Sequence, residues 1–587
     1  MKLIRRKTFN RMKLRLGRLY GRDRAEQLSE RLYMLIGRYG VNSREVETKT
    51  IAMEKQWSEK DAILITYGDM VRNGGEKPLK LLKEFCDRRL RGAINTVHIL
   101  PFFPSSSDAG FAVIDYRAVS EELGTWNEVE RISGDYGLMM DLVLNHCSRE
   151  SAWFRDYVNG IAPGSEYFQE GDPEADLSAV VRPRPWPLLS KTETSRGVRH
   201  VWTTFSEDQV DLNWKSPDVL FEFLDLLLNY VSRGARIVRL DAVAFLWKQV
   251  GTSCVHLPET HEVVKLMRDV LTTVAPHVIL LTETNVPHHE NVSYFGRGDE
   301  AQMVYQFALP PLLLHGLLRG TSAHLRKWAR SLGDVPKGCS FLNFTASHDG
   351  VGVRPLEGLV ADEEVEWLVR QIEARGGLVS YRSLQNGEKK PYELNVTYRD
   401  ALDDPEDKMR GLHRFLCSQA VMLSLRGMPA VYFHSLVGGR NWSEGPGLEG
   451  GENRDINRRR WHWKELEELL DDPDGDHCWV MNVYTRMLRA RAACPAFHPD
   501  APQEVLDTAD EVLALLRQSL DGRVKVMCCF NFAGEDVLLP REALTMQLGE
   551  APSFRNLLNG RDLEFGEGGF SIQPYGCVWV VAGRRAR

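Results

Sequence analysis

The sequence predicts an α/β protein whose core is a closed barrel of eight parallel strands with covering helices, a (β/α)8 TIM barrel. Short apolar runs rich in β-branched residues recur along the chain, and most of the segments between them have room for one helix. Strands that are apolar throughout are typical of a parallel sheet covered on both faces, and eight strand–helix units can close a barrel. We expect the strands at residues 62–68, 94–100, 138–145, 236–243, 278–284, 302–307, 340–346 and 428–433.

The segments outside these units predict three additions to the barrel. The N-terminal segment has apolar positions at helical spacing and indicates a basic helical extension. About 90 residues separate the third strand from the fourth, which favours an inserted small domain over a loop. Short strands and Gly-rich turns near the end predict a C-terminal antiparallel β-domain. The expected division is 1–58 for the N-terminal helical extension, 59–146 and 236–495 for the two parts of the barrel, 147–235 for the inserted domain and 496–587 for the β-domain.

Charge and composition exclude several classes of function. The net charge of −7 gives no general affinity for nucleic acid, and no apolar run approaches the roughly 18 residues that span a bilayer. The basic N-terminus lacks the apolar segment of a secretory signal. The ten cysteines form no CxxC pair, and several lie in apolar stretches, which indicates reduced thiols in a cytoplasmic protein. The sequence predicts no metal site and no nucleotide-binding loop.

Charged side chains and histidines gather at one end of the expected barrel. Active sites of such barrels lie at the carboxyl ends of the strands, so we examined which residues follow each apolar run. Four strands deliver acids, two histidines and an arginine to this rim: Asp141, Asn145 and His146 from the third, Arg239 and Asp241 from the fourth, Glu283 from the fifth, and His348 and Asp349 after the seventh.

Asp241 and Glu283 form the candidate catalytic pair. Asp241 alone could be a helix N-cap or a solvated loop residue, since Asp favours both. However, Arg239 points to the same side of the strand, where it can keep Asp241 ionised as a nucleophile requires. Glu283 follows the apolar stretch VILLT, and apolar surroundings raise the pKa of a carboxyl group, which suits a proton donor. Such a pair is the arrangement of retaining glycosidases, in which the carboxyl groups are roughly 5 to 5.5 Å apart.

Four segments resemble the signature segments of the α-amylase clan of glycoside hydrolases. They occur in the order that the clan requires and on the corresponding strands: DLVLNH (141–146), RIVRLDAVAF (236–245), LLTETN (280–285) and FTASHD (344–349). The resemblance implies that Asp241 is the nucleophile, Glu283 the general acid/base and Asp349 the third carboxylate, which binds sugar hydroxyls. It also implies that Arg239, His146 and His348 surround the sugar at the site of cleavage.

A narrower resemblance involves HILPFFPSSSDAGFAVIDYRAV (98–119), LITYGD near the start of the barrel and NRDINRRR (453–460). These segments are similar to those of sucrose phosphorylases. By that resemblance Asp108 helps to close a pocket for a single glucose and Phe111 forms an apolar wall for its ring. Arg454 resembles the arginine that contacts sugar or phosphate. A closed pocket suits an enzyme that moves one glucosyl unit.

The segment GEKKPYELNVTY (387–398) departs from the sucrose phosphorylases in the loop for the acceptor, where Lys390 replaces an acidic residue and Glu393 a glutamine. Lys389 and Lys390 would attract an anionic acceptor, although a solvated basic turn explains them equally well. The chain therefore resembles most closely the glucosylglycerate phosphorylases, whose acceptor D-glycerate carries a carboxylate. The resemblance further implies that substrate is bound by Phe245, at the end of the segment 236–245, and by Arg354, Lys390 and Tyr392 in and near this region.

The implied reaction has two steps. Glu283 protonates the glycosidic oxygen while Asp241 attacks the anomeric carbon, and phosphate then attacks the glucosyl enzyme. The products are α-glucose 1-phosphate and D-glycerate, with phosphate as co-substrate and no other cofactor. The alternatives are a sucrose or sucrose 6′-phosphate phosphorylase, an α-glucosidase or transglucosidase, and a non-catalytic barrel that binds sugar or a partner. Analogy with relatives implies a homodimer.

Overall fold

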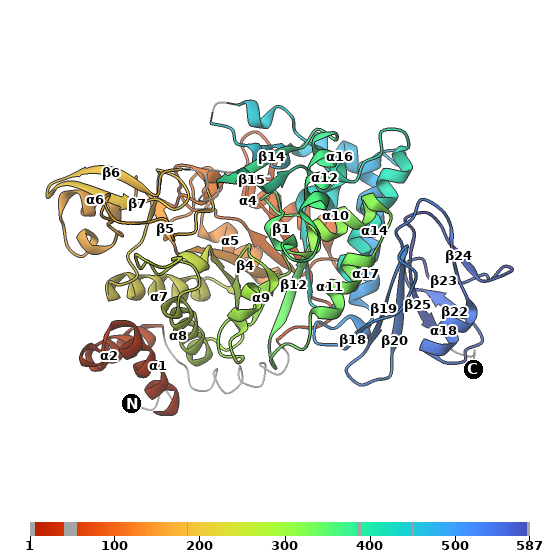
Figure 1. The fold of residues 1–587 in the computed structure, drawn as a ribbon, viewed down its shortest axis with the longest axis horizontal. Coiled ribbons are helices and arrows are strands. Elements are labelled where there is room, and N and C mark those ends of the chain that lie inside the picture. The colour runs from red at the N-terminus through yellow and green to blue at the C-terminus, as the bar shows by residue number, and fades with distance from the viewer. Residues whose placement is uncertain (1–5, 40–55, 185, 384–388, 449, 584–587) are drawn as a thin grey trace.

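The computed structural model describes residues 6–39, 56–184, 186–383, 389–448 and 450–583. Within these ranges eight parallel strands form a closed barrel, and each coincides with one of the apolar runs that predict it (Figure 1). Nearly every strand residue is buried, because side chains fill the barrel and helices cover its outer face. In order around the barrel the strands are β1 (Ile63–Thr66), β16 (Met428–Tyr432), β12 (Ser340–Phe344), β11 (Met303–Tyr305), β10 (Ile279–Thr282), β9 (Ala235–Asp241), β4 (Gly137–Val143) and β3 (Thr96–Ile99).

The helices around the barrel begin at residues that suit a helix start. Helices α4 (Pro78–Phe85), α7 (Pro217–Ser232) and α8 (Pro258–Val274) each begin with proline, whose fixed φ matches the first helical position and whose missing N–H is not needed there. Helix α5 (Trp126–Asp135) begins with a capping box from Thr125. Further helices are α9 (His288–Asn291), α10 (Leu309–Arg319), α11 (Ala323–Ser331), α12 (Asp362–Glu373), α14 (Lys408–Ser424), α16 (Trp463–Asp471) and α17 (Asp476–Ala492).

The order of the strands brings the candidate acids to one rim. Strand β9 lies between β4 and β10, so Asp241 is paired with Val143 on one side and Arg239 with Leu281 on the other. Glu283 directly follows β10, and its backbone N–H donates to the carbonyl of Leu240. Because all strands run in the same direction, these residues lie together at the carboxyl end of the barrel.

The segment between β4 and β9 forms the predicted insertion. Its helix α6 (Ala152–Asn159) and the hairpin of β6 (Leu189–Thr194) and β7 (Gly197–Trp202) lie at one edge of the molecule (Figure 1). Strands β5 (His146–Ser148) and β8 (Gln209–Asp211) pair next to the barrel rim. The excursion after β12 forms a three-stranded sheet of β13 (Val351–Gly352), β15 (Lys389–Asn395) and β14 (Leu378–Ser383). The limits of the inserted domain, 147–235, stay a proposal.

The C-terminal region forms an antiparallel sheet, as the turn-rich sequence predicts. In the part of the chain that the structure describes, the sheet has six strands, and helix α18 (Arg541–Leu548) packs against it. It lies at the opposite end of the molecule from the insertion (Figure 1). The strand order is β18 (Gln503–Val505), β19 (Val512–Gln518), β20 (Lys525–Asn531), β25 (Cys577–Ala582), β22 (Phe554–Asn556) and β23 (Arg561–Asp562).

The N-terminal extension forms two antiparallel helices, α1 (Arg6–Tyr20) and α2 (Arg22–Arg38), which we call the N-terminal arm. The arm packs beside α7 and α8, the helices on either side of β9 (Figure 1). Residues 40–55 of the predicted helical extension lie outside the described residues. Among the described residues no helix is long and apolar enough to cross a membrane. All ten cysteines lie in the described ranges and are free thiols, and most are buried.

Candidate active site

The carboxyl ends of the strands surround a cavity of about 110 Å³. A second cavity of about 780 Å³ shares Asp108, Arg184, Tyr392 and Arg454 with it and lies on its outer side. Twelve residues with a predicted catalytic or substrate-binding role line the inner cavity, whereas the predicted residues Asp141, Asn145, Lys389 and Lys390 do not. The predicted residues in the lining are Asp108, Phe111, His146, Arg239, Asp241, Phe245, Glu283, His348, Asp349, Arg354, Tyr392 and Arg454.

Arg239 joins two buried carboxylates at the centre of the rim. Its Nη1 donates a hydrogen bond to Oδ1 of Asp241 at 2.7 Å and also contacts Asp141 on the neighbouring strand β4. The other oxygen of Asp141 lies 2.6 Å from Nε2 of His98 on β3. Burial alone would raise the pKa of Asp141, but His98 and Arg239 lower it to about 2. Asp141 is therefore a fixed negative charge that holds Arg239 in place beneath Asp241.

Asp241 and Glu283 lie close enough to influence each other. Oε2 of Glu283 accepts a hydrogen bond from the backbone N–H of Ala242, the residue after Asp241, at 3.0 Å. Ala242 has a φ of 50°, a strained value for a residue with a side chain, which turns this N–H toward β10. Burial raises the pKa of both carboxyl groups, and the charge of Arg239 opposes the shift in each. Two buried neighbouring carboxyl groups with raised pKa values favour the retention of one proton between them.

Asp349 is held by Arg454 from the far side of the cavity. Nη1 of Arg454 lies 2.6 Å from Oδ1 of Asp349. The same guanidinium group donates two hydrogen bonds to the buried carboxylate of Glu393, at 3.0 and 2.9 Å. Burial would raise the pKa of Asp349, but Arg454 and His348 outweigh this effect and lower the pKa below its usual value. The third carboxylate is therefore ionised and rigidly oriented.

Two aromatic rings form one wall of the cavity. The rings of Phe111 and His348 are stacked, with their centroids 4.8 Å apart and their planes 5° from parallel. Burial lowers the pKa of His348 to about 3, so the imidazole is neutral at physiological pH. Its Nδ1 is buried and has no partner within the described residues.

The DAGF segment forms a tight turn at the edge of the cavity. Asp108, Ala109 and Gly110 have φ values of 51°, 46° and 109°, and a Cβ on Gly110 would lie 2.6 Å from the carbonyl oxygen of Pro101. Only glycine fits the last position. The turn presents Asp108, whose Oδ2 accepts a hydrogen bond from Nε2 of Gln209 at 2.9 Å. Its Oδ1 is buried without a partner within the described residues and can accept a further hydrogen bond.

His146 lies on the opposite side of this turn and is also positioned by Gln209. Its Nε2 lies 3.1 Å from Nε2 of Gln209 and 3.2 Å from the carbonyl oxygen of Phe111. Burial lowers the pKa of His146, so the ring is neutral. In a given neutral tautomer Nε2 either accepts from the amide group of Gln209 or donates to the carbonyl oxygen of Phe111, and either bond links strand β5 to the DAGF turn.

Lys390 does not reach the cavity, which corrects the expectation that it provides a counter-charge there. Its Nζ lies 3.0 Å from Oδ2 of Asp362, and its side chain is 41% exposed. Asp362 is the first residue of α12, where an acidic side chain is stabilised by the helix dipole. The ion pair holds the lysine against that helix on the protein surface. Lys389 lines the outer cavity but not the inner one.

Arginines provide the positive charge of the cavity instead. Arg354 and Arg382 both line it, and each is paired with one carboxylate, Glu290 at 4.0 Å and Glu357 at 2.7 Å. The Nε atoms of both arginines are buried and have no hydrogen-bond partner within the described residues. Arg184 lines both cavities. In contrast to Arg239 and Arg454, which each contact two carboxylates, these side chains can bind an anion.

Several residues of the site could not be identified from the sequence. Gln209 and Arg184 lie in the insertion, whose fold the sequence does not reveal. Arg382 lies on β14, a strand whose sequence has no apolar pattern. Phe205 and Phe307 also line the cavity and lie outside every quoted motif, whereas Phe344 begins the FTASHD segment but was given no role from the sequence. The one available signal was the density of arginines in VRPRPWP (181–187). No cluster of metal-ligating side chains occurs among the described residues.

Comparisons with known proteins agree with this geometry. Residues 91–327 match the model of the α-amylase catalytic domain. The glucosylglycerate phosphorylase of Spirochaeta thermophila is 47% identical over 89% of this chain and 89% of its own length. The glucosylglycerate phosphorylase of Escherichia coli (strain K12) is 43% identical over 80% of this chain and 84% of its own length.

More distant relatives act on other glucosides. The sucrose phosphorylase of Agrobacterium vitis is 31% identical over 77% of this chain and 91% of its own length. Among solved structures, that of sucrose 6F-phosphate phosphorylase from Thermoanaerobacter thermosaccharolyticum covers 82% of this chain and 95% of its own, with a TM-score of 0.71 at 25% identity. The α-amylase of H. orenii, at 15% identity and a TM-score of 0.62 over 89% of this chain and 99% of its own, shares the fold.

Proposed function

The chain belongs to the glucosylglycerate phosphorylases of the α-amylase clan, and we propose that it catalyses the reversible phosphorolysis of 2-O-α-D-glucosyl-D-glycerate to α-D-glucose 1-phosphate and D-glycerate. The observation that carries the proposal is the meeting, in one cavity, of three carboxylates with Arg354 and Arg382, each of which is paired with a single carboxylate. The carboxylates account for transfer of a glucosyl group with retention. The arginines account for two anionic co-substrates, glycerate and phosphate.

In the first step of the proposed reaction Asp241 attacks the anomeric carbon and Glu283 protonates the glycosidic oxygen. Burial raises the pKa of both groups, and Asp241 alone of the two receives a hydrogen bond from Arg239. A charge-assisted hydrogen bond stabilises the ionised form, so the proton that the pair retains lies on Glu283. The bond between glucose and glycerate breaks, glycerate leaves with the proton of Glu283, and a β-glucosyl ester forms on Asp241.

In the second step phosphate attacks the same carbon from the side that glycerate has left. The ester to Asp241 breaks, and the second inversion restores the α configuration. Glu283, now ionised, can accept the proton of the attacking phosphate. Phosphate is already an anion at neutral pH, so its main requirement is a site with positive charge. We propose that Arg354 and Arg382 supply that charge, and that they bind the carboxylate of glycerate in the reverse reaction.

The remaining residues of the cavity have proposed roles in binding glucose. Asp349, fixed by Arg454, accepts hydrogen bonds from sugar hydroxyls, and Asp108 does so through its unpartnered Oδ1. Phe111 and Phe245 contact the apolar face of the ring, and the neutral His146 and His348 complete the shell. Tyr392 borders both cavities, where an acceptor would enter. We assign Lys390 no role in binding.

The experiment that tests the function measures phosphate release from α-glucose 1-phosphate with D-glycerate, D-fructose, fructose 6-phosphate, glycerol or water as acceptor. Fast release with glycerate alone is the expected result. Fast release with fructose or fructose 6-phosphate would identify a sucrose-type phosphorylase that uses the same mechanism. Release with water alone would identify an α-glucosidase, and no release with any acceptor would overturn the assignment as a phosphorylase.

We propose three further features of the protein. The free and mostly buried thiols support a location in the reducing cytoplasm. Phosphate is the co-substrate, and the proposed steps need no other cofactor. A homodimer follows from analogy with relatives alone, and light scattering of the purified protein would test it.

A further inference from the structure

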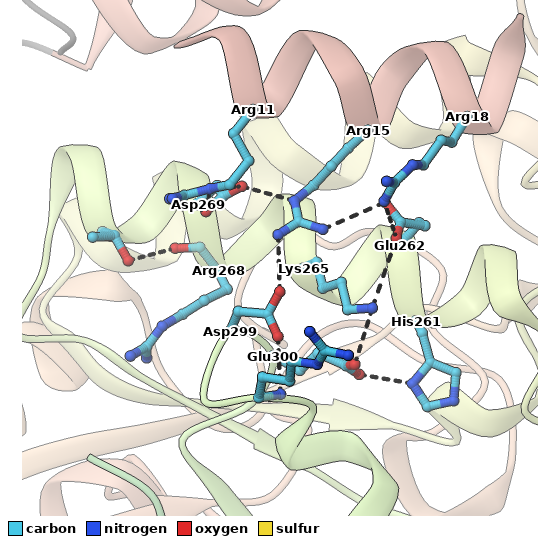
Figure 2. Close-up of polar contacts among 12 residues, drawn as sticks. Arg11, Arg15, Arg18, His261, Glu262, Lys265, Arg268, Asp269, Asp299 and Glu300 are labelled. Carbon is cyan, nitrogen blue, oxygen red and sulfur yellow. Dashed lines mark hydrogen bonds and ion pairs between the residues drawn. The ribbon is translucent and has the colours of Figure 1, made fainter. Parts of the chain in front are cut away.

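Three arginines of the N-terminal arm lie on one face of α1 and point toward α8. Arg11, Arg15 and Arg18 are three or four residues apart and therefore share a helix face. Figure 2 shows them above the carboxylates of Glu262 and Asp269 on α8. Helix α8 directly follows the strand and turn that carry Asp241, so the arm contacts the barrel in the sector of the active site.

Arg15 is the most buried of the three and contacts three carboxylates. Its side chain is 5% exposed and lies 2.8 Å from Asp269, 3.4 Å from Glu262 and 3.1 Å from Asp299. Asp269 is itself buried and also receives hydrogen bonds from Arg11. Asp299 belongs to the loop between β10 and β11, which follows Glu283 in the chain. Arg15 therefore ties this loop to α8.

Beyond Arg15, an ionic network continues toward the barrel (Figure 2). Glu262, which Arg15 and Arg18 both contact, lies 3.7 Å from Nζ of Lys265. Lys265 lies 3.4 Å from the buried carboxylate of Glu300, whose other oxygen is 2.7 Å from Nδ1 of His261. The loop that holds Glu300 is tight, because a Cβ at Gly296 would lie 2.7 Å from both Asp299 and Glu300.

The network ends at an arginine of the active-site cavity. The ring of His261 stacks on Tyr294 with centroids 4.6 Å apart, and the hydroxyl of Tyr294 lies 2.9 Å from Nδ1 of His256. Nε2 of His256 lies 3.2 Å from Glu290, which is the carboxylate paired with Arg354. Each of these side chains is at least partly buried, so solvent screens the contacts only weakly.

We propose that Arg15 is a positioning residue for Arg354, and that the N-terminal arm thereby sets the affinity of the cavity for phosphate and glycerate. The inference rests on the proposed function, because it takes Arg354 to bind the anionic co-substrates. Without Arg15, Asp269 keeps Arg11 and Glu262 keeps Arg18 and Lys265, whereas Asp299 has no ion pair left among the described residues. The loop that holds Asp299 and Glu300 would move, and the contacts from Glu300 to Glu290 would no longer hold Arg354 in one orientation.

Apolar contacts allow the arm to stay docked when Arg15 is replaced. Met12, Leu16, Leu28, Leu32 and Ile36 are all buried and belong to the same hydrophobic core as the barrel. Burial of several large apolar side chains contributes more than a single ion pair to docking. The substitution Arg15→Met keeps an apolar side chain and removes the charge. It therefore tests whether Arg15 positions Arg354 while the arm stays docked.

The test measures KM for inorganic phosphate, KM for D-glycerate and kcat in Arg15→Met, with Arg31→Met as the control. Arg31 also lies on the arm, and its contacts among the described residues are with Asp218 and Phe221 of α7 and not with the network. We expect KM for both anions to rise about 3- to 10-fold in Arg15→Met, with kcat changed less than twofold. Arg31→Met should leave both KM values unchanged. A uniform fall in kcat with unchanged KM values would overturn the proposal.

Two further variants test the route. His261→Phe keeps the stacking on Tyr294 but removes the contact with Glu300, and it should raise KM for the anions as Arg15→Met does. In a double-mutant cycle, Arg15→Met should add little to the effect of Arg354→Ala, because both act through the same side chain. Unchanged KM values in His261→Phe, or additive effects in the cycle, would exclude this route. Failure of the proposed function differs, because the wild-type protein itself would then lack phosphorolysis.

Discussion

A single guanidinium nitrogen of Arg239 donates to Oδ1 of Asp241 at 2.7 Å and also contacts Asp141. Because Asp141 is buried and ionised, it fixes Arg239 in position before any substrate binds. Arg239 in turn opposes the rise in the pKa of Asp241 that burial causes. The charge state of Asp241, the proposed nucleophile, therefore depends on both Arg239 and Asp141.

Replacement of the nucleophile should abolish turnover. We expect Asp241→Asn to lower kcat for phosphorolysis by about 1,000-fold or more, because an amide cannot form the glucosyl ester. Mass spectrometry of the quenched wild-type enzyme should show one added glucosyl group, which the variant lacks. Asp474→Asn, on an exposed loop, provides the control. A glucosyl enzyme that still forms in Asp241→Asn would contradict the assignment.

The pH dependence of kcat should report the proton on Glu283. The general acid acts only when protonated, and burial raises its pKa above the usual value for glutamate. Phosphorolysis should therefore persist to a higher pH than an ordinary glutamate would allow, and it should decline as pH rises through this raised pKa. Glu283→Gln should lower kcat about 100- to 10,000-fold. An alkaline decline that is unchanged in Glu283→Gln would assign the titration to another group.

Arginine, not lysine, should determine the binding of anions. Arg382→Ala removes a cation from the cavity and should raise KM for phosphate about 10-fold or more, since a hydrogen-bonded charge pair is worth about 1.5 to 3 kcal/mol. Lys390→Ala should leave KM for phosphate and for glycerate within about twofold, because Lys390 pairs with Asp362 outside the cavity. Equal effects of the two substitutions on KM would contradict the placement of the anion site.

The DAGF turn should tolerate no side chain at its glycine. Gly110→Ala places a Cβ 2.6 Å from the carbonyl oxygen of Pro101 and should cost about 1 to 3 kcal/mol in strain. We expect a lower midpoint of thermal unfolding and a higher KM for α-glucose 1-phosphate, because Asp108 would move. Gly134→Ala, on the exposed face of α5, meets no atom within 4 Å and should stabilise the helix by about 0.5 to 1 kcal/mol. A normal KM in Gly110→Ala would show that the turn does not position Asp108.

The barrel could be predicted from the sequence because its strands are buried on both faces. Each apolar run is confined to one strand, and the order of the strands follows the order of the chain. Asp241 and Glu283 could be located because Asp241 is the last residue of β9 and Glu283 directly follows β10. The strands could be predicted because burial of consecutive residues is a local property. It is visible in a short segment as a run of apolar residues.

The parts of the site that could not be predicted depend on contacts between distant segments. Asp362 precedes Lys390 by 28 residues and is one of many acidic side chains, so nothing in the sequence marks it as the partner. The same holds for Gln209, which reaches Asp108 across 101 residues of chain. The direction of a long charged side chain depends on the nearest opposite charge in space. The spacing of apolar residues in the sequence does not show where that charge lies.

The small inner cavity and the larger one beside it also have a kinetic consequence. Once a glucosyl group is bound to Asp241, the acceptor and phosphate must reach the same carbon from the same side, past the same bordering residues. Glycerate and phosphate then compete for one intermediate, and initial rates measured against either should give parallel lines in a double-reciprocal plot. In a living cell, the ratio of the two anions would decide how each glucosyl enzyme is partitioned between storage of glucose in the glycoside and its release as the sugar phosphate.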